Sequence, residues 1–205
     1  IEREVKSAEE AIAIEPALHH IRDRLAGATY APTDESGDAF KFTQNLAALC
    51  KAKGVTFKYG AMVEAIETDQ GKISGVRLRH STGHTETDTA DAYVCAMGSY
   101  SYLMLKPIGI TLPVYPAKGY SATLSTEGFS GAPSVSLTDE AMKIVFSRIG
   151  NRMRIAGTAE LDGYSTSLSM IRTEALVKRA RDLFPGAADY DNPVYWTGLR
   201  PATPS

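Results

Sequence analysis

Three segments of the chain combine residue types that could bind a ligand. The first, residues 91–101, is an apolar run that leads into Gly98 and a group of small hydroxyl residues. Glycine lets a backbone pass close to a ligand, and the amides that follow can donate hydrogen bonds to phosphate oxygens. The simpler alternative is a buried strand that ends in a turn. The residue pattern leaves both interpretations open.

The other two segments each place a cation beside residues that stiffen the backbone. Residues 112–121 contain Pro113 and Pro116, followed by Lys118 next to a glycine, a pattern that is also typical of a domain linker. In residues 196–204, Arg200 stands between a leucine and a proline at the end of an apolar run. A guanidinium with a fixed direction can hold a carboxylate through two parallel hydrogen bonds. Arg200 is therefore a candidate carboxylate-binding residue, with a structural ion pair as the alternative.

Other patterns that would indicate a site are absent from the sequence. It contains no glycine-rich dinucleotide fingerprint, no phosphate-binding P-loop, no nucleophile elbow, no Cys-x-x-Cys pair and no zinc-protease helix motif. His80 and His84 are four residues apart, but the Ser-Thr-Gly between them predicts a solvated turn rather than a helix. We therefore expect no metal site.

Composition excludes several classes of protein. Of the 205 residues, 43% are hydrophobic and 22% are charged, which is typical of a globular chain with a sizeable core. The net charge of −2 provides no basic field for a nucleic-acid backbone, so no nucleic-acid partner is expected. The two cysteines cannot form a disulfide scaffold and fit reduced cytosolic thiols. No apolar run is long enough to span a bilayer.

The elements that must position these segments follow from hydrophobic periodicity. Ser7 and Glu10 predict a capping box for a helix over residues 8–14. Asp38 predicts the start of a second helix that stops at Gly54, and a third is expected over residues 169–184 with a helical turn at 102–105. Alternation predicts strands over residues 55–59, 62–68, 73–78, 92–96, 115–124, 143–149, 153–159 and 194–199. The expected fold class is α+β, with a mixed, largely antiparallel sheet and flanking helices.

The two ends of the sequence lead to a further expectation. The chain starts without methionine and stops directly after a predicted strand. Because a domain seldom ends on a strand with no closing element, we interpret the sequence as an internal segment of a longer protein.

Five strings, in this order, carry a family resemblance. They are residues 13–18, 34–39, 115–121, 156–161 and 196–201. They resemble the FAD-dependent amine oxidoreductases that include D-amino acid oxidase and glycine oxidase and, within that family, the D-amino acid dehydrogenases. The resemblance covers nearly the whole chain.

The resemblance implies two interleaved domains. Residues 39–102 are similar to the middle part of an FAD-binding domain, whose dinucleotide motif and last FAD-binding segment would lie outside this sequence. Residues 1–38 and 103–205 are similar to the substrate domain. Because those two FAD segments are missing here, we expect the isolated chain to be inactive and not to retain FAD. We also expect it to self-associate through an exposed sheet edge.

The same resemblance implies site residues. Val63 matches a strand whose backbone contacts the adenine end of FAD, and Ala96 and Gly98 match a turn that passes near the cofactor. Arg200 matches an arginine that pairs with the substrate carboxylate. The oxidases place a substrate-binding tyrosine on the strand that matches residues 143–146, and this sequence has no tyrosine there. Contacts to the substrate amine therefore stay unassigned, and no catalytic acid or base is nominated.

The activity that the resemblance implies is oxidative deamination of a D-amino acid to a 2-oxo acid and ammonia, with hydride transfer to FAD. It further implies a respiratory electron acceptor and a cytoplasmic protein, with peripheral binding to the inner face of the bacterial inner membrane as a variant. One alternative is a related FAD amine oxidase of the glycine or sarcosine type. Another is a non-catalytic sheet domain used for subunit contact.

Overall fold

The chain folds into two compact units, as seen in a computed structural model that describes residues 2–204. The first unit combines Ile1–Phe42 with Lys118–Gly198, and the second combines Thr43–Ala117 with Leu199–Ser205. Each unit is thus assembled from stretches that are far apart in the sequence. The assignment of residues 39–102 to an FAD-binding domain, and of the remainder to a substrate domain, stays a prediction.

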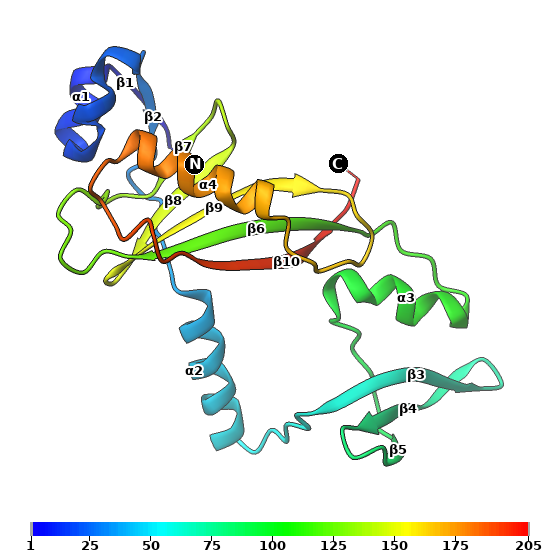
Figure 1. The fold of residues 1–205 in the computed structure, drawn as a ribbon. Coiled ribbons are helices and arrows are strands. Elements are labelled where there is room, and N and C mark those ends of the chain that lie inside the picture. Colours follow the sequence, from blue (N-terminus) through cyan, green and yellow to red (C-terminus); the bar gives the residue numbers. More distant parts are fainter. Residues whose placement is uncertain (1, 205) are drawn as a thin grey trace. The chain divides into compact units, whose positions relative to one another are not determined.

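A five-stranded sheet forms the centre of the first unit (Figure 1). Its strand order is β10-β6-β9-β8-β7, and β6, β9, β8 and β7 pair antiparallel in that sequence. The strands are β6 (Tyr115–Ser125), β7 (Leu137–Asp139), β8 (Ile144–Ile149), β9 (Arg152–Glu160) and β10 (Val194–Ala202). The predicted fold class, with its largely antiparallel sheet, is confirmed. The predicted hairpin at Gly150 is also confirmed, because Ile149 pairs with Arg152 across a two-residue turn.

Helix α4 (Met170–Leu183) lies along one face of this sheet (Figure 1). Leu176 and Ala180 on the helix are fully buried, as are Met153 and Ile155 on β9. A Cβ at Gly157 would lie 2.9 Å from Ile144 Cγ1 and 3.1 Å from Leu176 Cδ2. Glycine at this position therefore lets the helix approach the sheet closely.

The N-terminal part of the first unit packs against this core. It contains β1 (Glu4–Lys6), α1 (Ala8–Ile14), the 3₁₀ segment η1 (Pro16–Arg24) and β2 (Ala28–Tyr30), which pairs with β1. The capping box is confirmed: Ser7 N donates to Glu10 Oε2 at 2.8 Å, and Glu10 N donates to Ser7 Oγ at 3.2 Å. The three-residue strands β1, β2 and β7 and the four-residue strand β5 (Thr85–Asp88) were not predicted, because such short strands leave almost no alternation to detect. Segment η1 was not predicted either.

The second unit contains a three-stranded antiparallel sheet of β3 (Ala61–Asp69), β4 (Lys72–His80) and β5 (Thr85–Asp88). Helix α2 (Ala39–Ala52) leads into it, and η2 (Gly98–Tyr100), α3 (Ser101–Leu105) and η3 (Lys106–Ile108) follow it. Asp38 Oδ1 accepts hydrogen bonds from the amides of Phe40 and Lys41, which confirms the predicted helix start. Helix α2 buries no residue among those described.

Two predicted strands are wrong. Residues 55–59 and 92–96 belong to no sheet in the described part of the chain, and residue 59 lies in a turn. A strand needs a partner as well as apolar residues, and neither segment has one. Their side chains accordingly face solvent: Val94 is 90% exposed and Tyr59 is 77% exposed.

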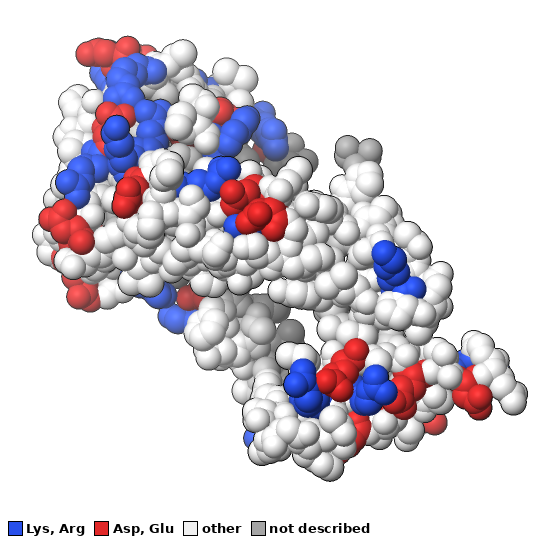
Figure 2. Space-filling model, turned by 45° about the vertical axis from the view of Figure 1, so that its right-hand side comes forward, with Lys and Arg blue, Asp and Glu red and all other residues white. Residues whose placement is uncertain are grey.

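Charged side chains of both signs lie close together on the surface. Figure 2 shows lysine and arginine next to aspartate and glutamate across the visible face. Ion pairs such as Lys58 with Asp88 at 2.6 Å and Arg79 with Glu64 at 2.6 Å account for part of this pattern. Within residues 2–204, no helix has both the length and the apolar character needed to cross a membrane.

Candidate functional site

Residues 92–98, in the second unit, include backbone groups that are open to a ligand. Residues 92–96 make no backbone hydrogen bond within the described chain, and Ala96 is exposed. The segment ends at Gly98, whose φ of +56° lies in the left-handed region that favours glycine. The segment therefore has unpaired backbone donors and acceptors directly before a tight turn.

The structure places the end of β10 beside this turn. A Cβ built at Gly98 would lie 4.0 Å from Pro201 Cγ. The sequence pattern predicted that Arg200 follows the end of this strand. Strand β10 instead continues to Ala202, so Arg200 lies within it. Its side chain is exposed, and no hydrogen bond or ion pair of Arg200 is found among residues 2–204. Arg200 is therefore available to an external carboxylate.

Val63 lies on β3 of the same unit, beside an irregularity in the sheet. It pairs with Leu78 of β4, and the register shifts between Val63 and Ala65. Glu64 is thus the extra residue of a β-bulge, and it forms an ion pair with Arg79. Among residues 2–204, no hydrogen bond joins Val63 to Gly98 or Arg200, although β3 contacts α3, the helix that follows Gly98.

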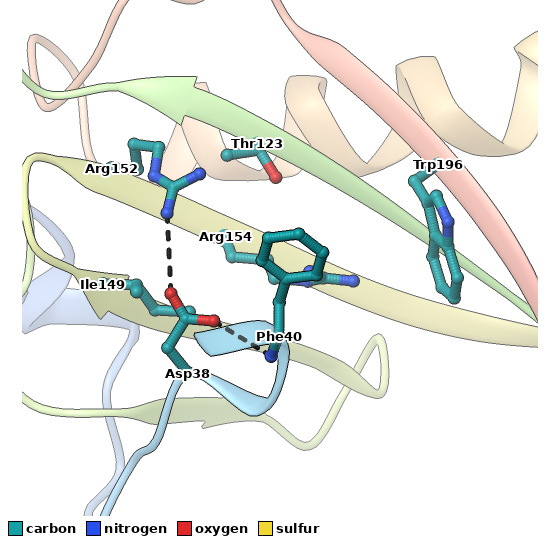
Figure 3. Close-up of a pocket in the computed structure, with 7 residues that line it drawn as sticks. All are labelled: Asp38, Phe40, Thr123, Ile149, Arg152, Arg154 and Trp196. Atoms are coloured by element: carbon teal, nitrogen blue, oxygen red, sulfur yellow. Dashed lines mark hydrogen bonds and ion pairs between the residues drawn. The ribbon is translucent and has the colours of Figure 1, made fainter. Parts of the chain in front are cut away.

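The first unit contains a cavity of about 450 Å³ on the sheet face opposite α4 (Figure 3). Alternation explains this placement: Met153 and Ile155 face the core, so Arg152 and Arg154 point to the other side. The lining residues come from the start of α2 and from four strands, and they are Asp38, Phe40, Thr123, Ile149, Arg152, Arg154 and Trp196. Trp196 belongs to the candidate segment 196–204, but none of the lining residues was itself nominated to bind a ligand.

The two arginines of the cavity differ in their partners. Arg152 Nη2 lies 3.7 Å from Asp38 Oδ2, whereas Arg154 has no carboxylate partner in the described chain. Arg154 Nη2 instead donates to Ser121 Oγ at 3.2 Å, and its Cζ lies 5.5 Å from the centroid of the Trp196 ring. This arrangement is a cation–π contact with a guanidinium that still has free donors.

A second group of ionised side chains surrounds Lys118 on β6. Lys118 is only 2% exposed, and its Nζ lies 2.8 Å from Asp162 Oδ2 and 3.0 Å from Glu160 Oε2. The hydroxyl of Tyr120 also donates to Glu160. Thr158 explains why these groups meet: it is the extra residue where β9 shifts register against β6, and its φ is +58°. The bulge turns Glu160 to the side of the sheet that carries Lys118.

These contacts shift the pKa of each member of the group. The hydrogen bond with Asp162 raises the pKa of Lys118 above its ordinary 10.5, with Glu160 adding to the effect. Tyr120 and then Lys118 lower the pKa of Glu160 below 4.5, and Lys118 lowers that of Asp162 below 3.8. Burial raises the pKa of Tyr120. Lys118, Glu160 and Asp162 are therefore ionised around neutral pH, whereas Tyr120 is neutral, and the four side chains form a structural ion-pair cluster.

Sequence reasoning selected Lys118 but not its partners, and it missed Arg154 and Trp196 as a pair. One signal was present: arginines alternate with buried apolar residues along β9. Among the described residues, no cluster of three or more His, Cys, Asp or Glu side chains is arranged to hold a metal ion.

Comparison with curated proteins shows strong similarity to one enzyme class. The chain is 55% identical over 205 residues to a D-amino acid dehydrogenase of Dechloromonas aromatica, with 100% of this chain and 49% of that protein covered. A D-amino acid dehydrogenase of Methylobacterium nodulans is 48% identical over 193 residues, which cover 94% of this chain and 45% of that protein. The chain thus spans about half the length of the curated relatives that it matches.

Solved structures and the family match agree with this relationship. Glycine oxidase from Bacillus cereus superposes with a TM-score of 0.79 at 22% identity, covering 98% of this chain and 53% of that one. Glycine oxidase from Geobacillus kaustophilus superposes with a TM-score of 0.76 at 25% identity, covering 98% of this chain and 52% of that one. Residues 1–205 match the DAO family, described as FAD dependent oxidoreductase. The chain therefore belongs to this family of FAD-dependent oxidoreductases.

Proposed function

We propose that these 205 residues form part of an enzyme that oxidises D-amino acids with FAD. The observation that carries the proposal is 55% identity to a D-amino acid dehydrogenase along the entire chain. The exposed, unpaired guanidinium of Arg200 supports it, because the substrate class always carries a carboxylate. The overall reaction converts a D-amino acid to an imino acid, which water hydrolyses to a 2-oxo acid and ammonia.

The residues predicted to approach FAD fit a backbone contact with it. Residues 92–96 offer unpaired backbone groups, and the left-handed Gly98 presents no side chain at the turn. Ala96 and Gly98 would hold the cofactor in this way, and Val63 would contact it from β3, which is an edge strand of its sheet. When bound, FAD supplies the two-electron acceptor for the hydride that leaves the substrate Cα.

Arg200 has the orienting role in this proposal. Its planar guanidinium can hold the substrate carboxylate through two parallel hydrogen bonds, which fixes the direction of the Cα–H bond. Pro201 restricts the backbone of Arg200 to an extended conformation, consistent with its place in β10. The contribution of Arg200 is therefore orientation of the substrate, and it involves no proton transfer.

A chimera tests the proposal. Residues 1–205 would replace the matching segment of the Dechloromonas aromatica enzyme, and FAD absorbance would be followed without oxygen after addition of D-alanine, L-alanine, glycine or sarcosine. We expect bleaching with D-alanine and none with L-alanine. Bleaching only with glycine or sarcosine would favour the amine oxidase alternative. A chimera that holds FAD but responds to no substrate would favour the non-catalytic sheet domain.

Three further properties are proposed. On the family resemblance, we propose that electrons pass to a respiratory acceptor rather than to oxygen and that the protein binds peripherally to the inner membrane; from the exposed sheet edge, we propose that the isolated chain self-associates. Reoxidation of the reduced chimera by a soluble quinone faster than by air supports the first. Sedimentation of the chimera with anionic vesicles, and of the 205-residue chain by itself, tests the other two.

A further inference from the structure

The cavity of the first unit contains one positive charge that no described residue neutralises. Arg152 and Arg154 contribute two cations, and Asp38 contributes the one carboxylate among the lining residues, 3.7 Å from Arg152. Arg154 is bound by a neutral hydroxyl and an aromatic ring. The excess charge is thus located on Arg154 and amounts to one unit.

The aromatic floor of the cavity has a defined position. A Cβ at Gly198 would lie 2.2 Å from Trp196 Cη2 and 2.6 Å from Trp196 Cζ2. The indole therefore lies flat along β10 in the space that the glycine leaves free. Arg154 stacks on this ring and is held at one nitrogen by Ser121, a residue that is 2% exposed. Figure 3 shows both side chains and Phe40 around the same cavity.

This geometry leaves a donor surface and an apolar surface next to each other. A guanidinium has five N–H donors, and the bond to Ser121 uses one of them. Trp196 is 57% exposed and Phe40 is 69% exposed, so both rings are accessible from the cavity. The volume of about 450 Å³ lies within the roughly 300–1,000 Å³ that is usual for small-molecule sites.

We propose that this cavity binds a small monocarboxylate with a flat or apolar body. The carboxylate pairs with the free edge of Arg154, and the body lies against Trp196 and Phe40. A single excess charge matches a monoanion better than a phosphate dianion. The inference does not depend on the proposed function, because none of these residues was assigned to FAD or to the substrate carboxylate.

The protein carries its own reporter for this site. Trp196 is the only tryptophan in the sequence, so indole emission from the 205-residue chain reports on the cavity alone. The probe is 3-phenylpropionate, and its neutral amide is the control of equal shape. Inorganic phosphate tests an anion without an apolar body. The indole N–H resonance of isotope-labelled protein gives a second readout for binding that leaves the emission unchanged.

We expect saturable binding of 3-phenylpropionate and binding of the amide and of phosphate that is at least tenfold weaker. Arg154→Gln should weaken binding of the acid at least tenfold, and Arg154→Lys should recover part of the loss. Arg148→Gln is the matched control on β8. Among residues 2–204, the side chain of Arg148 bonds only to the Gly150 carbonyl, through Nε, and this variant should bind as the wild type does. Circular dichroism would confirm that each variant is folded. Equal binding of acid and amide, no saturable response in either readout, or full affinity in folded Arg154→Gln would overturn the proposal.

Discussion

Glu15 offers a stability test that can be worked out from its contacts. Its side chain is 3% exposed and accepts four hydrogen bonds. Oε1 accepts from Ala17 N at 3.1 Å, and Oε2 accepts from Ser134 N at 2.6 Å, from Ser134 Oγ at 2.9 Å and from Val135 N at 2.9 Å. Glu15 therefore ties the start of η1 to a loop that lies 119 residues further along the chain.

The expected magnitude follows from the donors that Glu15→Ala would leave without a partner. Ser134 is exposed, so water can replace its two bonds, whereas Ala17 and Val135 are half-buried. An unsatisfied buried donor costs roughly 1–3 kcal/mol, and two partly buried donors together cost about 2–3 kcal/mol. Glu15→Gln keeps one oxygen but turns an NH₂ group toward a donor, so about half of that loss is expected.

The measurement is urea unfolding of the 205-residue chain, followed by far-UV circular dichroism and by Trp196 emission. Glu9→Ala is the control, because Glu9 forms only an exposed pair with Arg22 at 2.8 Å and should change stability by less than about 0.5 kcal/mol. If Glu15→Ala is within about 1 kcal/mol of the wild type, the carboxylate does not hold the two segments together. If Glu15→Ala does not fold, the free energy of unfolding of Glu15→Gln tests the same interpretation, because a loss of about half the size is expected for that variant.

Three other predictions concern pH, the aromatic floor and the cofactor. Lys118→Met should lower the Tm most between about pH 4.5 and 10.5. The raised pKa of Lys118 contributes stability that is fully present below pH 10.5, the pKa of an unfolded lysine. The lowered pKa values of Glu160 and Asp162 contribute stability that is present above pH 4.5 and 3.8, the pKa values of these groups in the unfolded chain. The difference from the wild type should shrink below pH 3.8 as the carboxylates protonate, and a difference independent of pH would contradict the ion-pair interpretation. Gly198→Ala should shift Trp196 emission to the red, because the new methyl group would displace the indole ring. The free energy of unfolding should change by less than about 1 kcal/mol, since an exposed indole can move away. Unchanged emission would show that the ring does not lie over the glycine. The purified 205-residue chain should contain no stoichiometric flavin absorption, and a yellow chain would refute the expected loss of FAD.

The elements that were predicted correctly carry their own local signals. The capping box at Ser7 and the cap at Asp38 are encoded within a few residues, and so is the turn at Gly150. The wrong strands at 55–59 and 92–96 have apolar residues but no partner in the described structure, and pairing is a property that local sequence does not contain.

The candidate sites depended on contacts across long sequence separations. Alternation alone would place Glu160 on the opposite face from Lys118, and only the bulge at Thr158 reverses this. Arg154 and Trp196 are on strands that become linked through β6, which lies between them in the sheet. The residue pattern and the family resemblance both selected Arg200, but the strand that contains it runs further than its hydrophobic pattern indicates.

The most direct test of the central claim is the effect of Arg200 substitutions on kcat/KM of the chimera for a D-amino acid. A charge-assisted hydrogen bond is worth roughly 1.5–3 kcal/mol, and ~1.4 kcal/mol corresponds to a factor of ten. Arg200→Ala should therefore lower kcat/KM by about one to two orders of magnitude, Arg200→Lys should be intermediate, and FAD content should not change. If folded Arg200→Ala chimera that still contains FAD keeps its kcat/KM, Arg200 does not bind the substrate carboxylate and the proposed site is wrong.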